Sequence, residues 1–178
     1  INSDDAFEKG LKKAGLTASP EDIASAQGQA VRAKAKAITG KKMNFALQGR
    51  MGIVIDGTGK DYAKIKKQVD MLRTIGYAVH MIFVNTDLDT ALERNKMRPR
   101  SLEDGLVTKM WKDVQKNIGK FQALFRDRMT IVDNSEGSNI EKATMDAYKK
   151  IQTWAKKAPE NSIAIKWIKG QRGNNEKF

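Results

Sequence analysis

Two short acidic segments of the sequence combine residue types and spacing that could do chemistry. Asp4 and Asp5 are adjacent carboxylates, and such a pair could anchor a metal ion or act as a general base. Asp56 opens the segment DGTGK, which follows the apolar run of residues 53–55. Each has a structural alternative. The first pair could be a helix N-cap and first-turn acid, and the second segment a tight turn that needs glycine for its geometry.

A third segment, ERNKMRPRSLED, holds three guanidinium groups. Arg94, Arg98 and Arg100 fall within seven residues, and Pro99 stops the preceding helix. Arginines on a short segment over a cleft can follow the charge of a transferring phosphoryl group. The alternative is a solvated segment without chemistry.

The glycine-rich segment is not a Walker A phosphate loop. That loop needs two glycines five residues apart, closed by Lys and then Ser or Thr, so that main-chain N–H groups wrap the phosphates. Here Asp61 follows Gly59-Lys60, and Val54 stands where the first glycine would be. No other part of the 178 residues has the pattern either.

Strands that alternate with helices must position these groups. Short apolar segments predict strands at Ile53–Ile55, Ala78–Val84 and Met129–Val132. Such alternation is typical of βαβ units and a mainly parallel sheet, in which ligands collect at the carboxyl ends of the strands. The DGTGK segment would therefore border a cleft. His80 lies within the second strand, and we expect a strand residue there and not a catalytic base.

The helices are predicted from apolar residues that recur every three or four positions. These patterns place helices at residues 62–72, 88–92, 107–125 and 140–154. A further helix is expected from Pro20 to Ile38, with a stop at Gly40. From Gly170 onwards there is no apolar pattern, so we expect a frayed tail.

Charge and composition limit the class of protein. The net charge is +12, and residues 9–42 and 148–178 each hold eight Lys or Arg against two acids. These patches favour a nucleic acid or a nucleotide-like polyanion as partner, whereas solvated helix faces are the plain alternative. Cysteine is absent and His80 is the only histidine, so we expect no metal site built from these residues. No apolar run reaches the roughly 20 residues of a membrane span, and we expect a cytoplasmic protein.

Three segments, in their order along the chain, resemble the polynucleotide-kinase and zeta-toxin branch of the P-loop kinases. INSDDAF looks like the end of that family's second strand, and VIDGT like the end of its third. GYAVHMIFVNTDLDTALERNKMR looks like its fourth strand, a short helix and an arginine lid of the pattern Arg-Asn-x-x-Arg. The resemblance implies a three-layer α/β fold, with a P-loop kinase-like parallel sheet, helices on both faces, a helical N-terminal insertion and the arginine lid.

The resemblance also implies roles for residues. Asp4 would be the base that activates an acceptor hydroxyl, with Asp5 as the alternative because the register can shift by one. The acceptor would be bound by the strand-end segment, namely Asp56, Gly57, Thr58 and Lys60. The lid arginines would be Arg94 and Arg98, and Arg100 could substitute for one of them. ATP and Mg²⁺ are the implied cofactors, because the arginines and the metal stabilise the charge of the transferring group.

The chain departs from this family because it has no phosphate loop. In the family the loop and its strand precede the segment matched by INSDD, so we expect both upstream of Ile1. We expect residues 1–155 to form an incomplete kinase-like domain and 156–178 a basic, partly disordered extension. The predicted function is a kinase for a hydroxyl of a nucleic-acid end, nucleotide or sugar-nucleotide. The alternative is an inactive P-loop fold that binds nucleic acid or an assembly through its basic patches.

Overall fold

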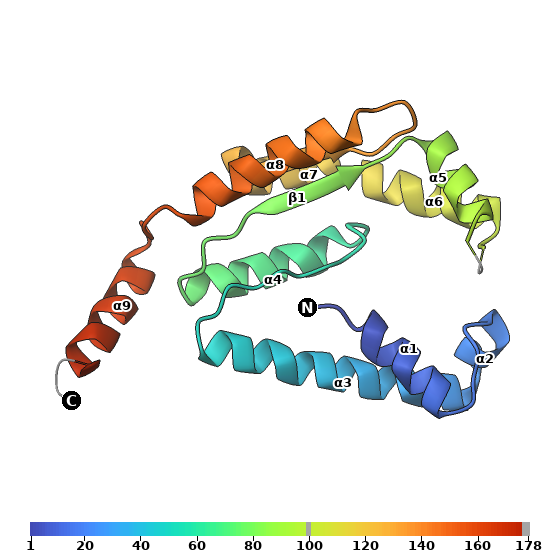
Figure 1. The fold of residues 1–178 in the computed structure, drawn as a ribbon, viewed down its shortest axis with the longest axis horizontal. Helices are drawn as coiled ribbons and strands as arrows, with labels where there is room; N and C mark the ends of the chain where they lie inside the picture. The colour runs from blue at the N-terminus through green and yellow to red at the C-terminus, as the bar shows by residue number, and fades with distance from the viewer. Residues whose placement is uncertain (99–100, 176–178) are drawn as a thin grey trace. The chain divides into compact units, whose positions relative to one another are not determined.

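The computed structural model describes residues 1–98 and 101–175, without the side chains of 174 and 175, and it divides into two compact units. The first unit is Ile1–Thr58 and the second is Gly59–Phe178. The described residues are rich in helix (Figure 1), and they contain one two-stranded parallel sheet. This agrees with an α/β P-loop-like fold.

The first unit is helical. Its elements are α1 (Asp4–Lys13), α2 (Pro20–Ala24) and α3 (Ala26–Gln48). We expected one helix from Pro20 to a stop at Gly40. The start at Pro20 is confirmed, but the continuous helix and the stop at Gly40 were wrong. Ser25 breaks the helix: its hydroxyl donates to the carbonyl of Asp22 at 2.6 Å and accepts from the amide of Gly28 at 3.0 Å. It therefore caps a new helix, which continues through Gly40.

The expected strand Ile53–Ile55 is reduced to one pair of main-chain hydrogen bonds. The amino group of Ile1 donates to the carbonyl of Val54, and the amide of Asp56 donates to the carbonyl of Ile1 at 3.3 Å. Bonds to residues on either side of Ile55 are the pattern of parallel pairing. The contact sets Asn2 beside Asp56, although no strand is formed here.

The second unit contains the sheet. Its elements are α4 (Tyr62–Thr74), β1 (Met81–Asn85), α5 (Leu88–Lys96), α6 (Asp104–Gln115), α7 (Ile118–Phe125), the 3₁₀ turn η1 (Arg126–Arg128), β2 (Met129–Asp133), α8 (Ile140–Ala155) and α9 (Ser162–Asn175). The strands run parallel and in register, from Met81 opposite Met129 to Asn85 opposite Asp133. Both predicted strands of this unit are confirmed, with the first beginning at Met81 and not at Ala78.

Each face of the sheet receives different helices, because successive strand residues point to opposite faces. Phe83 and Met129 join a buried cluster with Val69 of α4 and with Phe121 and Phe125 of α7. α8 packs on β2, and α4 and α8 lie on opposite sides of β1 (Figure 1). Phe121 and Phe125 of α7 therefore belong to the core.

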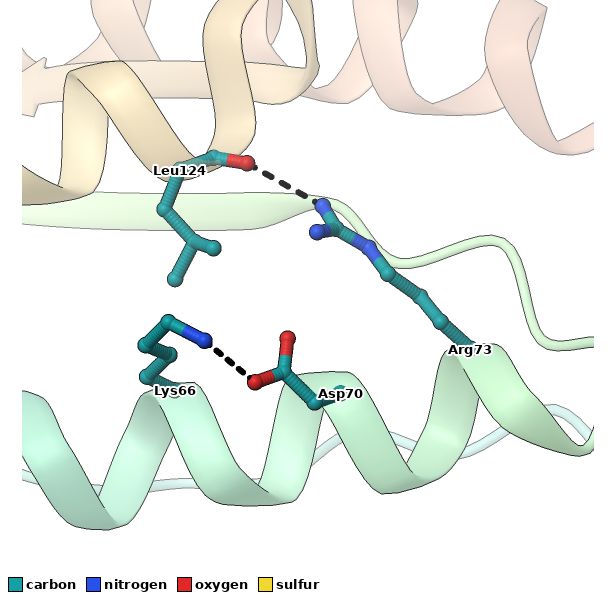
Figure 2. Close-up of polar contacts among 4 residues, drawn as sticks. All are labelled: Lys66, Asp70, Arg73 and Leu124. Atoms are coloured by element: carbon teal, nitrogen blue, oxygen red, sulfur yellow. Dashed lines mark hydrogen bonds and ion pairs between the residues drawn. The ribbon is translucent and has the colours of Figure 1, made fainter.

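A guanidinium group joins α4 to α7. Figure 2 shows Arg73 reaching from α4 to donate to the carbonyl of Leu124 at 3.1 Å. Its guanidinium carbon also lies 6.0 Å from the centre of the Phe125 ring. On the same helix Lys66 and Asp70 form an i,i+4 ion pair at 2.5 Å, in which both side chains are about half exposed. The hydrogen bond of Arg73 fixes the packing of α4 on α7, whereas the exposed ion pair contributes little to the stability of the fold.

Two expectations for the second half of the chain were wrong. The single helix predicted over 107–125 is broken into α6 and α7 at Asn117, whose side chain bonds to a distant loop. The tail expected from Gly170 is part of α9 as far as Asn175. Residues 176–178 lie outside the described part of the chain, and the division at residue 155 stays a prediction.

No helix in the described ranges combines the length and apolar character that crossing a membrane requires.

Gly28 provides a test of how α2 and α3 meet. A Cβ at this position would lie 2.1 Å from the main-chain oxygen of Asp22, so the backbone must move. We expect Gly28→Ala to lower the free energy of unfolding by roughly 1–3 kcal/mol, measured by denaturant unfolding. Gly40→Ala on the same helix has open space and should raise it by about 0.5–1 kcal/mol through helix propensity. Equal effects of the two substitutions would contradict the close packing at Gly28.

Candidate functional site

Asp4 lines a small cavity between α1 and α3 in the first unit. The cavity has a volume of about 220 Å³ and is lined by Ser3, Asp4, Phe7, Arg32, Ala35 and Lys36. The guanidinium carbon of Arg32 lies 5.0 Å from the centre of the Phe7 ring, which holds the cation at the cavity wall. One carboxylate and two cations thus share a cavity. The sequence analysis missed Arg32 and Lys36, although their four-residue spacing puts them on one face of a helix.

Asn2 connects two of the predicted acids. Its side-chain oxygen accepts from the amide of Asp4 at 2.8 Å, and its side-chain nitrogen donates to Oδ2 of Asp56 at 2.9 Å. A single amide therefore fixes the start of α1 and the Asp56 carboxylate together. The sequence predicted that Asp4 and Asp56 share a site, and the structure brings both to Asn2.

The other predicted residues of this unit are less engaged. Asp5 lies in the first turn of α1, is exposed and does not line the cavity. Gly57 and Thr58 are exposed in the loop that follows Asp56. Asp4 therefore lines the cavity whereas Asp5 does not, and the roles of both acids, of Gly57 and of Thr58 stay predictions.

The glycine-lysine turn that follows is packed against the core of the second unit. Gly59 is buried with φ +72°, and a Cβ there would touch the rings of Phe83 and Phe121 at 3.7 and 3.8 Å. The side-chain nitrogen of Asn117 donates to the carbonyls of Gly59 and Lys60 at 3.1 and 2.9 Å. The turn fixes this loop on the core and is not shaped as a cradle for the phosphates of ATP. The Lys60 side chain is exposed, and its contact with an acceptor stays a prediction.

Hydrogen bonds join the chain segments after the two strands, at the carboxyl end of the sheet. The Asp87 amide donates to Oγ of Ser135 at 2.9 Å, and the Trp111 ring donates to the carbonyl of Thr86 at 2.8 Å. Thr90 Oγ1 accepts from the Glu136 amide at 2.9 Å. This network holds the start of α5 and hence the helix that carries Arg94.

Asp87 is the N-cap of α5. Its carboxylate accepts from the Thr90 amide and from the Thr90 hydroxyl, both at 2.7 Å. These bonds, the amide first, lower the pKa of Asp87 from 3.8 to about 2. The carboxylate is therefore charged at neutral pH and complements the positive end of the helix.

Asn95 closes the loop that carries the arginine segment. Asn95 is buried, with only 5% of its surface exposed. Its side chain forms two hydrogen bonds with the main chain of Leu102, at 2.7 and 3.0 Å. Arg94 precedes it on the exposed side of α5, and Arg98 is exposed just beyond the helix end. Arg100 lies outside the described residues. In the pattern Arg-Asn-x-x-Arg, the asparagine thus has a structural role that the sequence analysis missed.

A comparison with protein-family models matched residues 18–144, more than half of the chain, to Zeta toxin. The chain belongs to the zeta toxin family. This family is P-loop kinase-like, and at family level its members are ATP-dependent phosphotransferases. A comparison with curated proteins found no match.

The matched span includes the DGTGK segment and the arginines of α5 and its following loop, but not Asp4 or Asp5. The family favours the kinase interpretation over an inactive binding protein. Zeta toxin-like kinases generally use ATP and Mg²⁺. In the described ranges no three His, Asp or Glu residues group as a metal site. The described residues thus contain a cavity lined by Asp4, Arg32 and Lys36 and an arginine segment after α5, and residues 1–178 contain no Walker A pattern.

Asn95→Ala tests the loop closure. Removing the amide leaves the N–H and C=O groups of half-buried Leu102 without these partners, so we expect the free energy of unfolding to fall by roughly 1–3 kcal/mol. Amide exchange at Leu102 should become faster. The control Glu93→Ala changes an exposed neighbour on α5 and should do neither. Unchanged exchange at Leu102 in Asn95→Ala would show that this side chain does not hold the loop.

Proposed function

We propose that this chain carries the acceptor-binding half of an ATP-dependent kinase whose acceptor is an anionic compound with a free hydroxyl. The observation that carries the proposal is the cavity in which Asp4 lies with Arg32 and Lys36. A carboxylate there can take a proton, while two cations attract and hold a negatively charged group of the acceptor. A nucleic-acid end, a nucleotide or a sugar-nucleotide has both features. In this proposal the chain belongs to the polynucleotide-kinase-like side of the family.

Asp4 acts as the general base in this proposal. Its main chain is fixed by Asn2, and its carboxylate would accept the proton of the acceptor hydroxyl as that oxygen attacks. Asp56 is held by the same asparagine. Its carboxylate would orient the acceptor by accepting a hydrogen bond from a second hydroxyl group. Arg32 and Lys36 contribute affinity and not proton transfer.

The arginine segment acts as a lid in this proposal. Arg94 and Arg98 are both exposed, and the closed loop at Asn95 limits how far Arg98 can move. Guanidinium groups at such a position stabilise the negative charge that spreads over a transferring phosphoryl group. Arg100 keeps its proposed role as a substitute.

The ATP phosphate loop would come from a segment outside residues 1–178. Support comes from β1, which in the described residues pairs only with β2. Ile82 and Val84 of β1 are 51% and 59% exposed, although parallel strands are normally covered on both faces. A strand added at this edge, with helices over it, would complete a three-layer fold. Peptide mapping of the native gene product tests this, since it should contain Gly-x-x-x-x-Gly-Lys-Ser/Thr.

Asp4→Asn and Asp5→Asn form a matched pair that tests the base. In the native gene product we expect Asp4→Asn to reduce kcat for phosphoryl transfer by roughly 10²–10⁴-fold, the range for loss of a general base. Asp5→Asn removes the same charge from the next residue and should change kcat less than threefold. Circular dichroism checks that both variants remain folded. The opposite ranking would make Asp5 the base, and equal activity of both variants with wild type would exclude this acidic pair.

A further inference from the structure

A second cavity lies at the amino ends of the strands, far from the arginine segment. His80 directly precedes β1 and Arg128 directly precedes β2, so the parallel register sets them side by side. The end of α8 covers them with Lys150 and Trp154. β1 has five residues, which at about 3.3 Å each separates this end from the carboxyl end by roughly 16 Å.

The cavity is large enough for a nucleotide and has an aromatic wall. Its volume is about 360 Å³, within the range of small-ligand pockets. The indole ring of Trp154 and the imidazole of His80 lie with ring centres 5.1 Å apart and tilted by 53°. Trp154 is half-buried, so part of its ring remains accessible to a base.

Positive charge dominates the lining. Arg128, Lys149, Lys150 and Lys157 face one acid, Asp127. Within residues 1–98 and 101–175, no ion pair involves Arg128, Lys149 or Lys157. Lys150 is the exception in having a fixed contact, because its amino group donates to the carbonyl of Met129 at 3.3 Å.

His80 adds a polar atom that has no partner. Its Nε2 lies 2.9 Å from Oγ1 of Thr130, while Nδ1 is buried and lacks a hydrogen-bond partner in the described part of the chain. Burial, followed by the charge of Lys150, lowers the pKa of His80. A pKa below 6.5 keeps the imidazole mainly neutral at pH 7, so His80 adds little positive charge to the cavity.

We propose that this cavity is a second binding site, for a nucleoside phosphate, with Arg128 and Lys157 on the phosphate and Trp154 beside the base. The three cations without an ion pair in the described ranges attract an anion, and an aromatic wall favours a flat ring over inorganic phosphate alone. The ligand is either a free nucleotide or one unit of a nucleic-acid strand. This site does not depend on the kinase proposal, because it uses none of the residues proposed for catalysis.

His80 gives the test its readout, because it lines the cavity and is the one histidine among residues 1–178; its resonances are assigned in the native gene product by their loss in His80→Gln. The native gene product is titrated without ATP, with AMP and with a ten-nucleotide single strand, while NMR follows the His80 ring. Binding of either ligand should shift the His80 resonances. A shift with AMP assigns the free nucleotide, and a shift with the strand alone assigns the polynucleotide. No shift with either would overturn the proposal.

The double variant Arg128→Gln/Lys157→Gln tests the phosphate contacts. We expect binding at least tenfold weaker. For the single strand, the slope of log K against the logarithm of the salt concentration should fall by about 0.7, the contribution of the one phosphate that the two cations contact. The control Lys109→Gln/Lys142→Gln removes the same charge from exposed positions on α6 and α8 and should change affinity less than twofold. Equal weakening by the two double variants would show general attraction to a basic surface and overturn the site.

Discussion

The parallel pairing of β1 with β2 is the constraint on which the second unit depends. Because the two strands run in register, every segment that precedes them meets at one end and every segment that follows meets at the other. His80 and Arg128 are neighbours for this reason, and so are Thr86 and Asn134, whose hydroxyl–carbonyl distance is 3.2 Å. The strand register thus creates a basic cavity at the amino ends of the strands. At their carboxyl ends it brings together the hydrogen-bonded segments that hold the start of α5.

Three asparagines, one in the first unit and two in the second, hold segments of the chain that have no regular structure. Asn2 bonds the amide of Asp4 and the carboxylate of Asp56, Asn95 bonds Leu102 twice, and Asn117 bonds two carbonyls at the glycine turn. A side-chain amide both donates and accepts, so one residue can satisfy two backbone groups. The acids and arginines proposed for chemistry all follow or adjoin such a clamp, which fixes the main chain while the charged side chains remain exposed.

The sequence predicted the elements that have strong periodicity. α4, α5, α8 and both strands lie close to the predicted positions because apolar residues there recur at helical spacing or form short runs. It failed where one side chain overrides the pattern. Ser25 begins a new helix inside an alanine-rich run, and Asn117 interrupts a continuous apolar stripe in order to bond Gly59 and Lys60. Neither effect can be predicted from local propensity, because each depends on a partner or a cap geometry set by folding.

The candidate site was predictable in part. Adjacent acids and the clustered arginines were found from residue type and spacing, whereas Arg32 and Lys36 were counted only as surface charge. Their place beside Asp4 depends on how α1 packs on α3, which needs the close contact of Gly10 with Val31. The function of Asn95 was hidden for the same reason, since its partner Leu102 lies beyond the arginine segment.

The most direct test of the account is acceptor preference. The native gene product would be given ATP labelled on its γ-phosphate and two acceptors that differ by one anionic phosphate group, a nucleoside and its monophosphate. The account predicts that label transfer to the monophosphate has a kcat/KM at least about tenfold higher, which corresponds to about 1.4 kcal/mol. The variant Arg32→Gln/Lys36→Gln should remove this preference, because it removes the two cations proposed to hold the phosphate. Transfer that ignores the acceptor's charge, or a preference unchanged in that variant, would contradict it.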